Sequence, residues 1–231
     1  VFTGAGISTG SGIPDFRGPT GVWQKRSPVY YQEFISDEDA RREYWEYKLE
    51  GYRAFRDARP NRAHLALVEL ERRGKLEALV TQNIDGLHQA AGTSSDKLIE
   101  LHGTNSAVEC IECHRRETPA RAMEAFEAMR EPPTCVECGG LLKPAVVMFG
   151  QSLDMNLLAR ALRCAERADL VLALGSSLVV TPAADVPLAG ARRGTPYVIV
   201  NQGETAHDRL ATLRIDRDVG EVLEHALGLG R

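Results

Sequence analysis

Apolar and polar positions along the chain fall into two alternating patterns. Short, unbroken apolar runs recur, and between them lie longer segments in which apolar residues return at every third or fourth position. The short runs are typical of strands buried on both faces, and the longer segments are typical of helices that cover a sheet. The predicted strands are residues 76–80, 98–101, 145–149, 170–174 and 197–200, and the predicted helices are residues 36–58, 61–74, 154–167, 183–193 and 219–227.

Strands that alternate with helices predict an α/β fold, in which a parallel sheet carries helices on both faces. Val1, Phe2 and Thr3 have the character of the end of a further strand, so we expect the natural chain to continue upstream of residue 1. The chain has 231 residues, of which 43% are hydrophobic. It can therefore bury the core of one large domain, or of one domain with an insert.

Charge and hydropathy narrow the function classes. The formal net charge is -4 with acidic and basic residues well mixed, which provides no basic patch for nucleic acid and tolerates a cationic partner. No apolar run reaches the roughly 18 to 20 residues of a membrane helix, and no secretory signal opens the sequence. We therefore expect a cytoplasmic protein with no direct contact to nucleic acid or membrane. The sequence does not predict its oligomeric state.

Small and polar residues follow the ends of several predicted strands. Residues 4–12 read GAGISTGSG, residues 81–88 read TQNIDGLH, and Gly175, Ser176, Ser177 and Asn201 follow two later strands. The carboxyl ends of parallel strands meet at one edge of a sheet, where open α/β sheets bind nucleotides. Glycines let the backbone approach a pyrophosphate, and a following helix would direct free amides toward it. These segments predict a nucleotide site, although residues 81–88 alone would equally suit a solvated turn built on Asn and Asp-Gly.

The glycine-rich segment departs from the dinucleotide fingerprint of dehydrogenases. Gly10 falls one position beyond the third glycine of G-x-G-x-x-G, and Val22, Trp23 and Gln24 stand about 20 residues on, where an acidic residue should hold the ribose. A hydride-transfer dehydrogenase is therefore disfavoured. Residues 13–18, which read IPDFRG, suit either a mobile lid over a cofactor or a surface loop.

Four of the five cysteines form two C-x-x-C pairs. Cys110 and Cys113 are separated from Cys135 and Cys138 by 21 residues, so four thiolates can surround one tetrahedral zinc ion at about 2.3 Å. Structural disulfides and the haem-attachment pattern C-x-x-C-H are the alternatives. Disulfides lack any sign of secretion, and haem leaves the second pair unexplained. No open coordination position is evident, so one structural zinc is expected.

The helix predicted at 36–58 is unusually aromatic. An aromatic stripe at helical spacing belongs more often to a core than to a cofactor site, and we assign this one to the core. His64, in the next helix, is likewise expected to be structural. The aromatic residues are Tyr44, Trp45, Tyr47, Tyr52 and Phe55.

Taken in order, these motifs resemble those of the sirtuins of the prokaryotic type, a family of NAD-dependent protein-lysine deacylases. The matching segments are residues 4–8 (GAGIS), 12–18 (GIPDFRG), 81–88 (TQNIDGLH), 102–103 (HG), 143–150 (KPAVVMFG) and 175–178 (GSSL), with the two C-x-x-C pairs. The resemblance covers nearly the whole chain. It implies a Rossmann-like doubly wound parallel sheet formed by residues 1–18, 59–104 and 144–231, a cofactor loop and helical segment at 19–58, and a smaller zinc-binding insert domain at 105–143.

The resemblance also implies the chemistry. NAD would lie between the two parts and be consumed as a co-substrate, giving nicotinamide, free lysine and O-acyl-ADP-ribose. His102 would act as general base on a ribose hydroxyl, a task that suits an imidazole because its ordinary pKa is about 6.5, while Asn83 and Asp85 hold the nicotinamide end and the ribose. The further cofactor contacts it implies are Gly4, Ala5, Gly6, Ser8, Asp15, Phe16, Arg17, Gln82, Ile84, Gly175, Ser176, Ser177 and Asn201, and the contacts to the acyl-lysine peptide are Val147, Phe149 and Gly150.

Other functions remain open on the sequence. An ADP-ribosyltransferase or glycohydrolase could use the same cleavage, and a module could bind NAD or ADP-ribose without catalysis, although the presence of both Asn83 and His102 argues against the latter. Sirtuins that accept acidic acyl groups carry Tyr-x-x-Arg on the helical segment. No tyrosine in residues 44–55 has an arginine three positions later, so we expect acetyl and other neutral acyl groups, although Lys48 or Arg53 could still reach into the acyl tunnel. Gln151 stands where the family commonly has glutamate, which leaves the peptide preference open.

Overall fold

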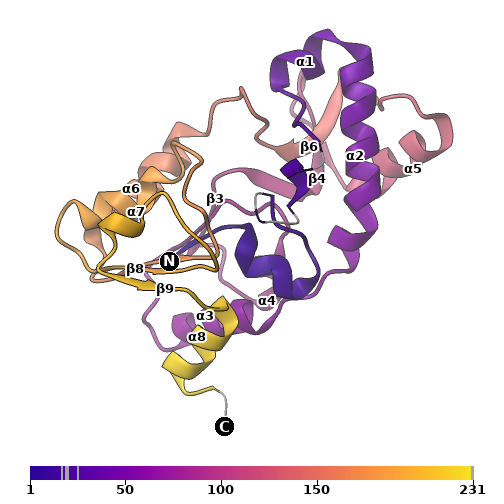
Figure 1. Ribbon diagram of the computed structural model, residues 1–231. Coiled ribbons are helices and arrows are strands. Elements are labelled where there is room, and N and C mark those ends of the chain that lie inside the picture. Colours follow the sequence, from indigo (N-terminus) through magenta and orange to yellow (C-terminus); the bar gives the residue numbers. More distant parts are fainter. Residues whose placement is uncertain (17, 19–20, 25, 230–231) are drawn as a thin grey trace.

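A parallel sheet forms the larger part of the molecule, and its strand order places the amino-terminal strand in the middle. The computed structural model describes residues 1–16, 18, 21–24 and 26–229 (Figure 1). Each neighbouring pair of strands is parallel, which confirms the predicted sheet, although β9 was not predicted. The strand order is β3 (Leu98–Glu100), β2 (Leu79–Thr81), β1 (Phe2–Thr3), β7 (Val171–Leu174), β8 (Tyr197–Val200) and β9 (Leu213–Ile215).

After β1 the chain forms β2 and β3 on one side of β1 within the sheet, and later forms β7, β8 and β9 on the other side of β1. Doubly wound sheets bind ligands where the strand order reverses in this way, outside the carboxyl ends of the strands. Here that point lies between β1 and β7, where Thr3 pairs with Leu174. The segments that follow these two strands therefore face the same crevice.

Helices cover both faces of the large sheet (Figure 1). On one face, α6 (Met155–Arg167) and α7 (Asp185–Ala191) bury Leu158, Ala161 and Val186 against Phe2 and Ile199. On the other, α3 (Arg62–Arg72) and α8 (Val219–Leu227) bury Leu67 and Leu223 against Ile7 and Leu79, and α4 (Leu87–Ala91) lies beside α3. Side chains of Asn61, Asp154 and Asp218 cap α3, α6 and α8, as such residues commonly do at helix starts.

A smaller antiparallel sheet lies at the other end of the molecule with its own core. Its order is β5 (Arg116–Glu117), β4 (Gly103–Cys110) and β6 (Leu142–Val146). Around it lie α1 (Tyr31–Ser36), α2 (Glu38–Asp57) and α5 (Pro119–Met129), with Phe34, Trp45, Phe126 and Met148 in the core. The strand predicted at 145–149 as part of the parallel sheet was therefore wrong, because residues 142–146 pair antiparallel with β4.

The glycine-rich segment also differs from the expectation. It forms a 3-10 helix, η1 (Ala5–Ser11), rather than a loop that leads into an α-helix. Two further 3-10 helices are η2 (Val22–Gln24) and η3 (Asp208–Leu210). Free amides near the crevice therefore come from irregular backbone rather than from the first turn of a long helix. Among the described residues, no helix combines the length and the apolar character needed to cross a membrane.

Candidate active site

A large cavity lies between the carboxyl edge of the parallel sheet and the smaller sheet. Its volume is about 1440 Å³, more than the roughly 300 to 1,000 Å³ of ordinary ligand pockets, which suits a site for two substrates. Ser8 lies behind the wall, and Arg17 lies outside the described residues. The other predicted contacts all line the cavity: Gly4, Ala5, Gly6, Asp15, Phe16, Gln82, Asn83, Ile84, Asp85, His102, Val147, Phe149, Gly150, Gly175, Ser176, Ser177 and Asn201.

The loop between β2 and α4 arranges its side chains through hydrogen bonds to η1. The amide of Asn83 donates to Gly4 O and to Ser8 Oγ, each at 3.2 Å, and Ser8 donates to Asp85 Oδ2 at 2.7 Å. The backbone N–H of Leu87 donates to the other carboxylate oxygen of Asp85 at 2.9 Å. Both amide hydrogens of Asn83 are thus in use, so its carbonyl oxygen is the group that its side chain offers to a ligand.

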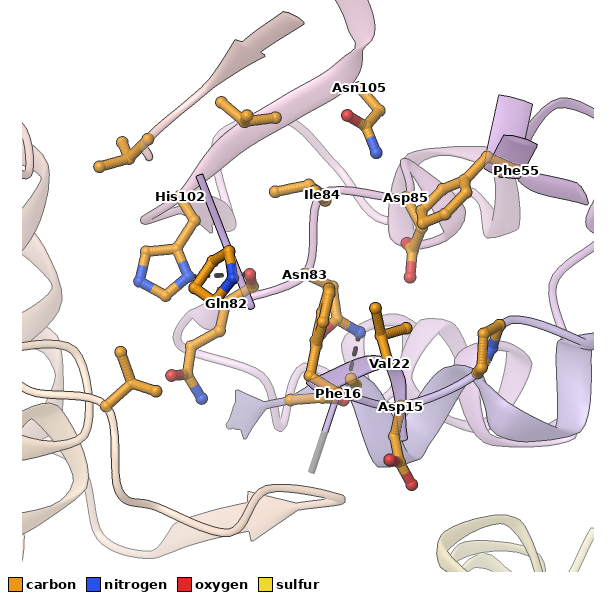
Figure 2. Close-up of a pocket in the computed structure, with 18 of the residues that line it drawn as sticks. Asp15, Phe16, Val22, Phe55, Gln82, Asn83, Ile84, Asp85, His102 and Asn105 are labelled. Atoms are coloured by element: carbon orange, nitrogen blue, oxygen red, sulfur yellow. Dashed lines mark hydrogen bonds between the residues drawn. The ribbon is translucent and has the colours of Figure 1, made fainter. Parts of the chain in front are cut away.

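His102 lies in the turn between β3 and β4 with one ring nitrogen held by backbone. Its Nδ1 is 3.0 Å from the carbonyl oxygen of Gln82, and the two residues lie next to each other in Figure 2. A carbonyl oxygen can only accept, so Nδ1 carries the hydrogen and Nε2 is the basic nitrogen of the neutral ring. The carbonyl of His102 accepts from the Val147 N–H at 2.9 Å. A potential general base of defined tautomer is therefore joined to the predicted substrate segment.

The segments after β1 and β7 pack backbone against backbone. A Cβ added to Gly6 would lie 2.9 Å from Gly175 Cα, and one added to Gly175 would lie 2.4 Å from Ile7 N. The N–H of Gly6 donates to Gly175 O at 2.8 Å, and Gly175 has a φ of +60°, in the left-handed region. Both positions need glycine for this close approach. The wall of the cavity here is main chain that a ligand can approach closely.

A side-chain bond joins the loops that follow β2 and β7. The amide of Gln82 donates to Ser176 Oγ at 3.0 Å, and the backbone N–H of Leu178 donates to the same oxygen at 3.2 Å. Closer to η1, the carboxylate of Asp15 accepts from the N–H of Gly18 at 2.7 Å. Hydrogen bonds therefore hold these polar side chains in place before any ligand arrives.

The aromatic stripe of α2 is only partly core, which corrects the expectation from sequence. Trp45 is fully buried, with its ring centroid 6.1 Å from that of Phe126. Tyr47, Tyr52 and Phe55 instead line the cavity (Figure 2 labels Phe55). Residues 47, 51 and 55 share one side of the helix, because they are four positions apart. The helical spacing of residues 47, 51 and 55 is visible in the sequence and could have revealed that α2 lines the cavity.

Lys48, which the sequence left open as a residue of the acyl tunnel, lines the cavity together with Asn105, which the sequence did not reveal. The ammonium of Lys48 donates to Asn105 Oδ1 at 3.1 Å and lies 5.3 Å and 5.7 Å from the ring centroids of Tyr44 and Tyr47. Burial, and then the nearby charge of Lys143, lowers the pKa of Lys48 to about 7. The cavity thus holds a cation that loses its charge easily.

Residues 147–150 continue β6 along the cavity. Because β6 is an edge strand of the smaller sheet, a peptide can add to this segment as a further strand. The ring of Tyr30 lies beside that of Phe149, with 5.9 Å between centroids. Gln151 Oε1 accepts from the Met148 N–H at 3.2 Å, a bond that a glutamate carboxylate could also accept. The departure from the family pattern at residue 151 therefore preserves the local turn.

The four predicted metal ligands converge at one point of the smaller sheet. The sulfur atoms of Cys110, Cys113, Cys135 and Cys138 all lie within 4.8 Å of one another, with 3.5 Å between Cys110 and Cys138 and 3.7 Å between Cys113 and Cys135. Sulfur atoms at about 2.3 Å from a tetrahedral zinc lie about 3.8 Å apart, so the cluster fits one zinc ion. Backbone N–H groups of Cys138 and Glu137 lower the pKa of the Cys135 thiol to about 7, which favours a thiolate.

Comparisons with known proteins agree with this fold. The sequence model of the Sir2 family matches residues 4–182. The NAD-dependent protein deacetylase of Rhodopseudomonas palustris is 43% identical over 227 residues, which are 98% of this chain and 90% of the relative. The NAD-dependent protein deacetylase of Thermotoga maritima is 43% identical over 231 residues, which are 100% of this chain and 92% of the relative.

The likeness extends to three dimensions. A solved structure of a Sir2 variant with a deacetylated p53 peptide and 3'-O-acetyl ADP-ribose matches this fold with a TM-score of 0.91 and 42% sequence identity. The match covers 99% of this chain and 92% of that chain. Since the sequence model, the relatives and the fold all agree over most of its length, the chain belongs to the Sir2 family.

Proposed function

We propose that this protein removes acyl groups, chiefly acetyl, from lysine side chains of proteins in an NAD-dependent reaction. The observation that carries the proposal is a general base of defined tautomer, His102, in the same cavity as the glycine-lined backbone after β1 and β7. When bound, NAD supplies an ADP-ribosyl group that is transferred to the acyl oxygen. One water molecule is consumed, and the products are nicotinamide, free lysine and O-acyl-ADP-ribose.

The backbone and the loop after β2 are suited to hold NAD. Gly4, Gly6 and Gly175 line the cavity and carry no side chain, which supports a role in binding phosphates through their backbone. Asn83 can offer its carbonyl oxygen to the carboxamide of nicotinamide. Asp85 accepts one hydrogen bond at each carboxylate oxygen, and a carboxylate oxygen has a second lone pair for a ribose hydroxyl.

His102 is proposed as the base that takes a proton from a ribose hydroxyl. The bond from Nδ1 to Gln82 O supports this role, because it fixes the orientation of the ring and directs proton uptake to Nε2. The hydroxyl oxygen that loses its proton can then attack the acyl carbon. His102 returns the proton when lysine leaves, so the base is regenerated in each cycle.

The acyl-lysine peptide is proposed to bind along residues 147–150 as an added strand. The unpaired edge of β6 supports this, with Val147, Phe149 and Gly150 as contacts. Phe16 and Val147 line the cavity and supply apolar surface for the acyl chain and the lysine stem. A chain of this kind enters more easily when its far end is neutral, since a buried carboxylate needs a cation to offset its desolvation.

The zinc ion would supply structure rather than chemistry. Four thiolates fill a tetrahedral site and leave no open position for a substrate. We propose that residues 105–143 form this structural module, residues 19–58 form the cofactor loop and a helical part, and residues 1–18, 59–104 and 144–231 bind NAD. A cytoplasmic location is proposed because thiolate ligands must stay reduced.

Mass spectrometry of an acetyl-lysine peptide incubated with the protein tests the proposal. We expect the peptide to lose its acetyl group only when NAD is present, with nicotinamide and O-acetyl-ADP-ribose formed in equal amounts. Transfer of ADP-ribose to a protein, or release of nicotinamide without loss of acetyl, would point instead to an ADP-ribosyltransferase or a glycohydrolase. NAD binding with no product at all would point to a binding module.

A further inference from the structure

A pair of buried histidines lies beneath the loop that carries Asn83. His64 on α3 and His88 on α4 are 0% and 1% exposed, and their ring centroids are 4.9 Å apart. Neither belongs to the residues that line the cavity, so neither can contact a substrate there. Burying a polar ring costs free energy unless its nitrogens are paired. The pair therefore needs an explanation that the proposed chemistry does not supply.

The hydrogen bonds assign opposite tautomers to the two rings. His64 Nδ1 accepts from the Asn61 N–H at 3.3 Å, so the hydrogen of the neutral ring is on Nε2. His88 Nε2 lies 3.0 Å from Thr3 Oγ1, whose own hydrogen is donated to Thr81 Oγ1 at 2.8 Å, so His88 Nε2 must donate. Among the described residues, His64 Nε2 and His88 Nδ1 have no hydrogen-bond partner, although in these tautomers the first is a donor and the second an acceptor.

This chain of bonds ends on Asn83. Thr81 Oγ1, which accepts from Thr3, also accepts from the backbone N–H of Asn83 at 3.0 Å. Thr3 and Thr81 are 0% and 2% exposed, so the bonds are shielded from water that could replace them. If His88 did not donate, the hydroxyl of Thr3 could turn its hydrogen elsewhere. The N–H of Asn83 would then face an acceptor whose orientation is no longer fixed.

We propose that His88, whose ring packs against that of His64, is a positioning residue for NAD. It sets the direction of the Thr3 and Thr81 hydroxyls, and these hold the backbone of Asn83 so that its carbonyl oxygen faces the cavity. The inference rests on the proposed function, because that function assigns Asn83 to the nicotinamide end of NAD. Burial keeps both rings neutral, since it lowers the pKa of His64 to about 4 against a smaller opposing effect of Asp85, and that of His88 to about 3.

Direct measurement of NAD binding tests the inference. His88→Leu removes the donor, and Thr3→Val removes the hydroxyl in the middle of the chain while it keeps the shape of the side chain. Isothermal titration calorimetry with NAD and no peptide should give a Kd raised about tenfold in both variants, the effect of one lost hydrogen bond. His88→Gln, whose amide can donate in place of Nε2, should restore the Kd to within about twofold of the wild type.

Leu67→Ala is the matched control, because Leu67 is fully buried on α3 but takes no part in the series of hydrogen bonds from His88 to Asn83. It should lower the Tm and leave the Kd for NAD unchanged. Wild-type affinity in both His88→Leu and Thr3→Val, or an equal loss in Leu67→Ala, would overturn the inference. A wild-type protein that binds NAD but does not deacetylate a peptide would refute the proposed function alone, since calorimetry does not depend on turnover.

Discussion

Two side chains in the cavity, those of His102 and Asn83, use their hydrogen-bond donors within the protein. The Nδ1 hydrogen of His102 is committed to Gln82 O, and the amide hydrogens of Asn83 are committed to Gly4 and Ser8. Groups that are already oriented need little reorganisation when charge develops during a reaction. The acceptor atoms of these two residues, His102 Nε2 and the side-chain carbonyl oxygen of Asn83, are therefore where substitutions should act on chemistry.

Replacing His102 by alanine should reduce turnover by about 10² to 10⁴, the usual contribution of a general base. The Kd for NAD should change by no more than about twofold, because the backbone of the cavity is unaltered. Steady-state deacetylation and calorimetry check the two expectations separately. His225→Ala, at an exposed histidine of α8, is the control and should match the wild type. Undiminished turnover in His102→Ala would remove His102 from the mechanism.

The acyl group is the second prediction at this scale. With a pKa of about 7, Lys48 is largely uncharged at mildly alkaline pH and offers a succinyl carboxylate little compensation for its desolvation. We expect kcat/KM for an acetyl peptide to exceed that of its succinyl counterpart by at least about tenfold. Lys48→Arg should narrow this ratio, because a guanidinium stays charged. Arg53→Gln, at an exposed position, should not. Equal or higher succinyl activity in the wild type would show the argument to be wrong.

At the scale of elements, the smaller sheet depends on the turns that hold its cysteines. Cys110 ends β4, and Cys135 and Cys138 lie just before β6. In each pair the residue after the second cysteine, His114 or Gly139, has positive φ, which lets the chain wrap back toward the cluster. Since β5 is only two residues long, hydrogen bonding alone holds this end of the sheet weakly.

We therefore predict one zinc ion per chain that is needed for the fold of this part. Structural zinc sites contribute on the order of 10 kcal/mol to folding, so Cys135→Ala should lose the metal and unfold the smaller sheet. Metal analysis and the fluorescence of Trp45, which packs in the adjoining core, report the two effects. Cys164→Ala, outside the cluster on α6, should keep both. A Cys135→Ala variant that retains zinc and stability would contradict the prediction.

Some elements were predictable to the residue, and others were not. β8 and α8 occupy the predicted positions because each has a clear period, and α8 also begins at a capping Asp218 and ends at Gly228. The apolar run at 145–149 indicated burial but not a partner, and pairing with β4 is a long-range choice that a local pattern does not encode. The short elements α4 and β9 offered too few positions to establish a period.

The same division holds for the site. Residues at strand ends, such as Gly4, Gln82 and Ser176, were predictable because the end of a strand is visible in the local sequence. Asn105 was not, and Lys48 was only an open alternative, because both reach the cavity where α2 lies against β4. The family resemblance supplied roles for the first group and none for the second.

At the scale of the whole molecule, stability should depend on pH through the buried histidines. In the unfolded chain their pKa is about 6.5, whereas in the folded chain it is about 4 for His64 and about 3 for His88. Their contribution is fully present above pH 6.5 and is lost as the pH falls toward the folded values, because the unfolded chain then binds more protons. The free energy of unfolding should fall by about 2–4 kcal/mol between pH 7 and pH 5 from this source.

Urea unfolding of the wild type and of His88→Gln across this range isolates the contribution. The variant removes one of the two titrating rings, so its loss of stability between pH 7 and pH 5 should be about half as large. Carboxylates and cysteines titrate alike in both proteins and cancel in the difference. Parallel curves for the two proteins would show that His88 does not contribute.

The contact between Gly6 and Gly175 restricts which amino-acid substitutions this protein can accept during evolution. A clash can often be relieved by a second substitution, as at Gly220, where an added Cβ would meet the side chain of Arg62, which can be shortened. At Gly6 and Gly175, each atom that an added Cβ would meet belongs to the main chain, and no substitution removes a main-chain atom. A library that allows second-site changes should recover replacements at Gly220 and none at Gly6 or Gly175. Exchange of the side chains around the crevice can therefore change the specificity of this protein, while the spacing of the two backbone segments stays as it was inherited.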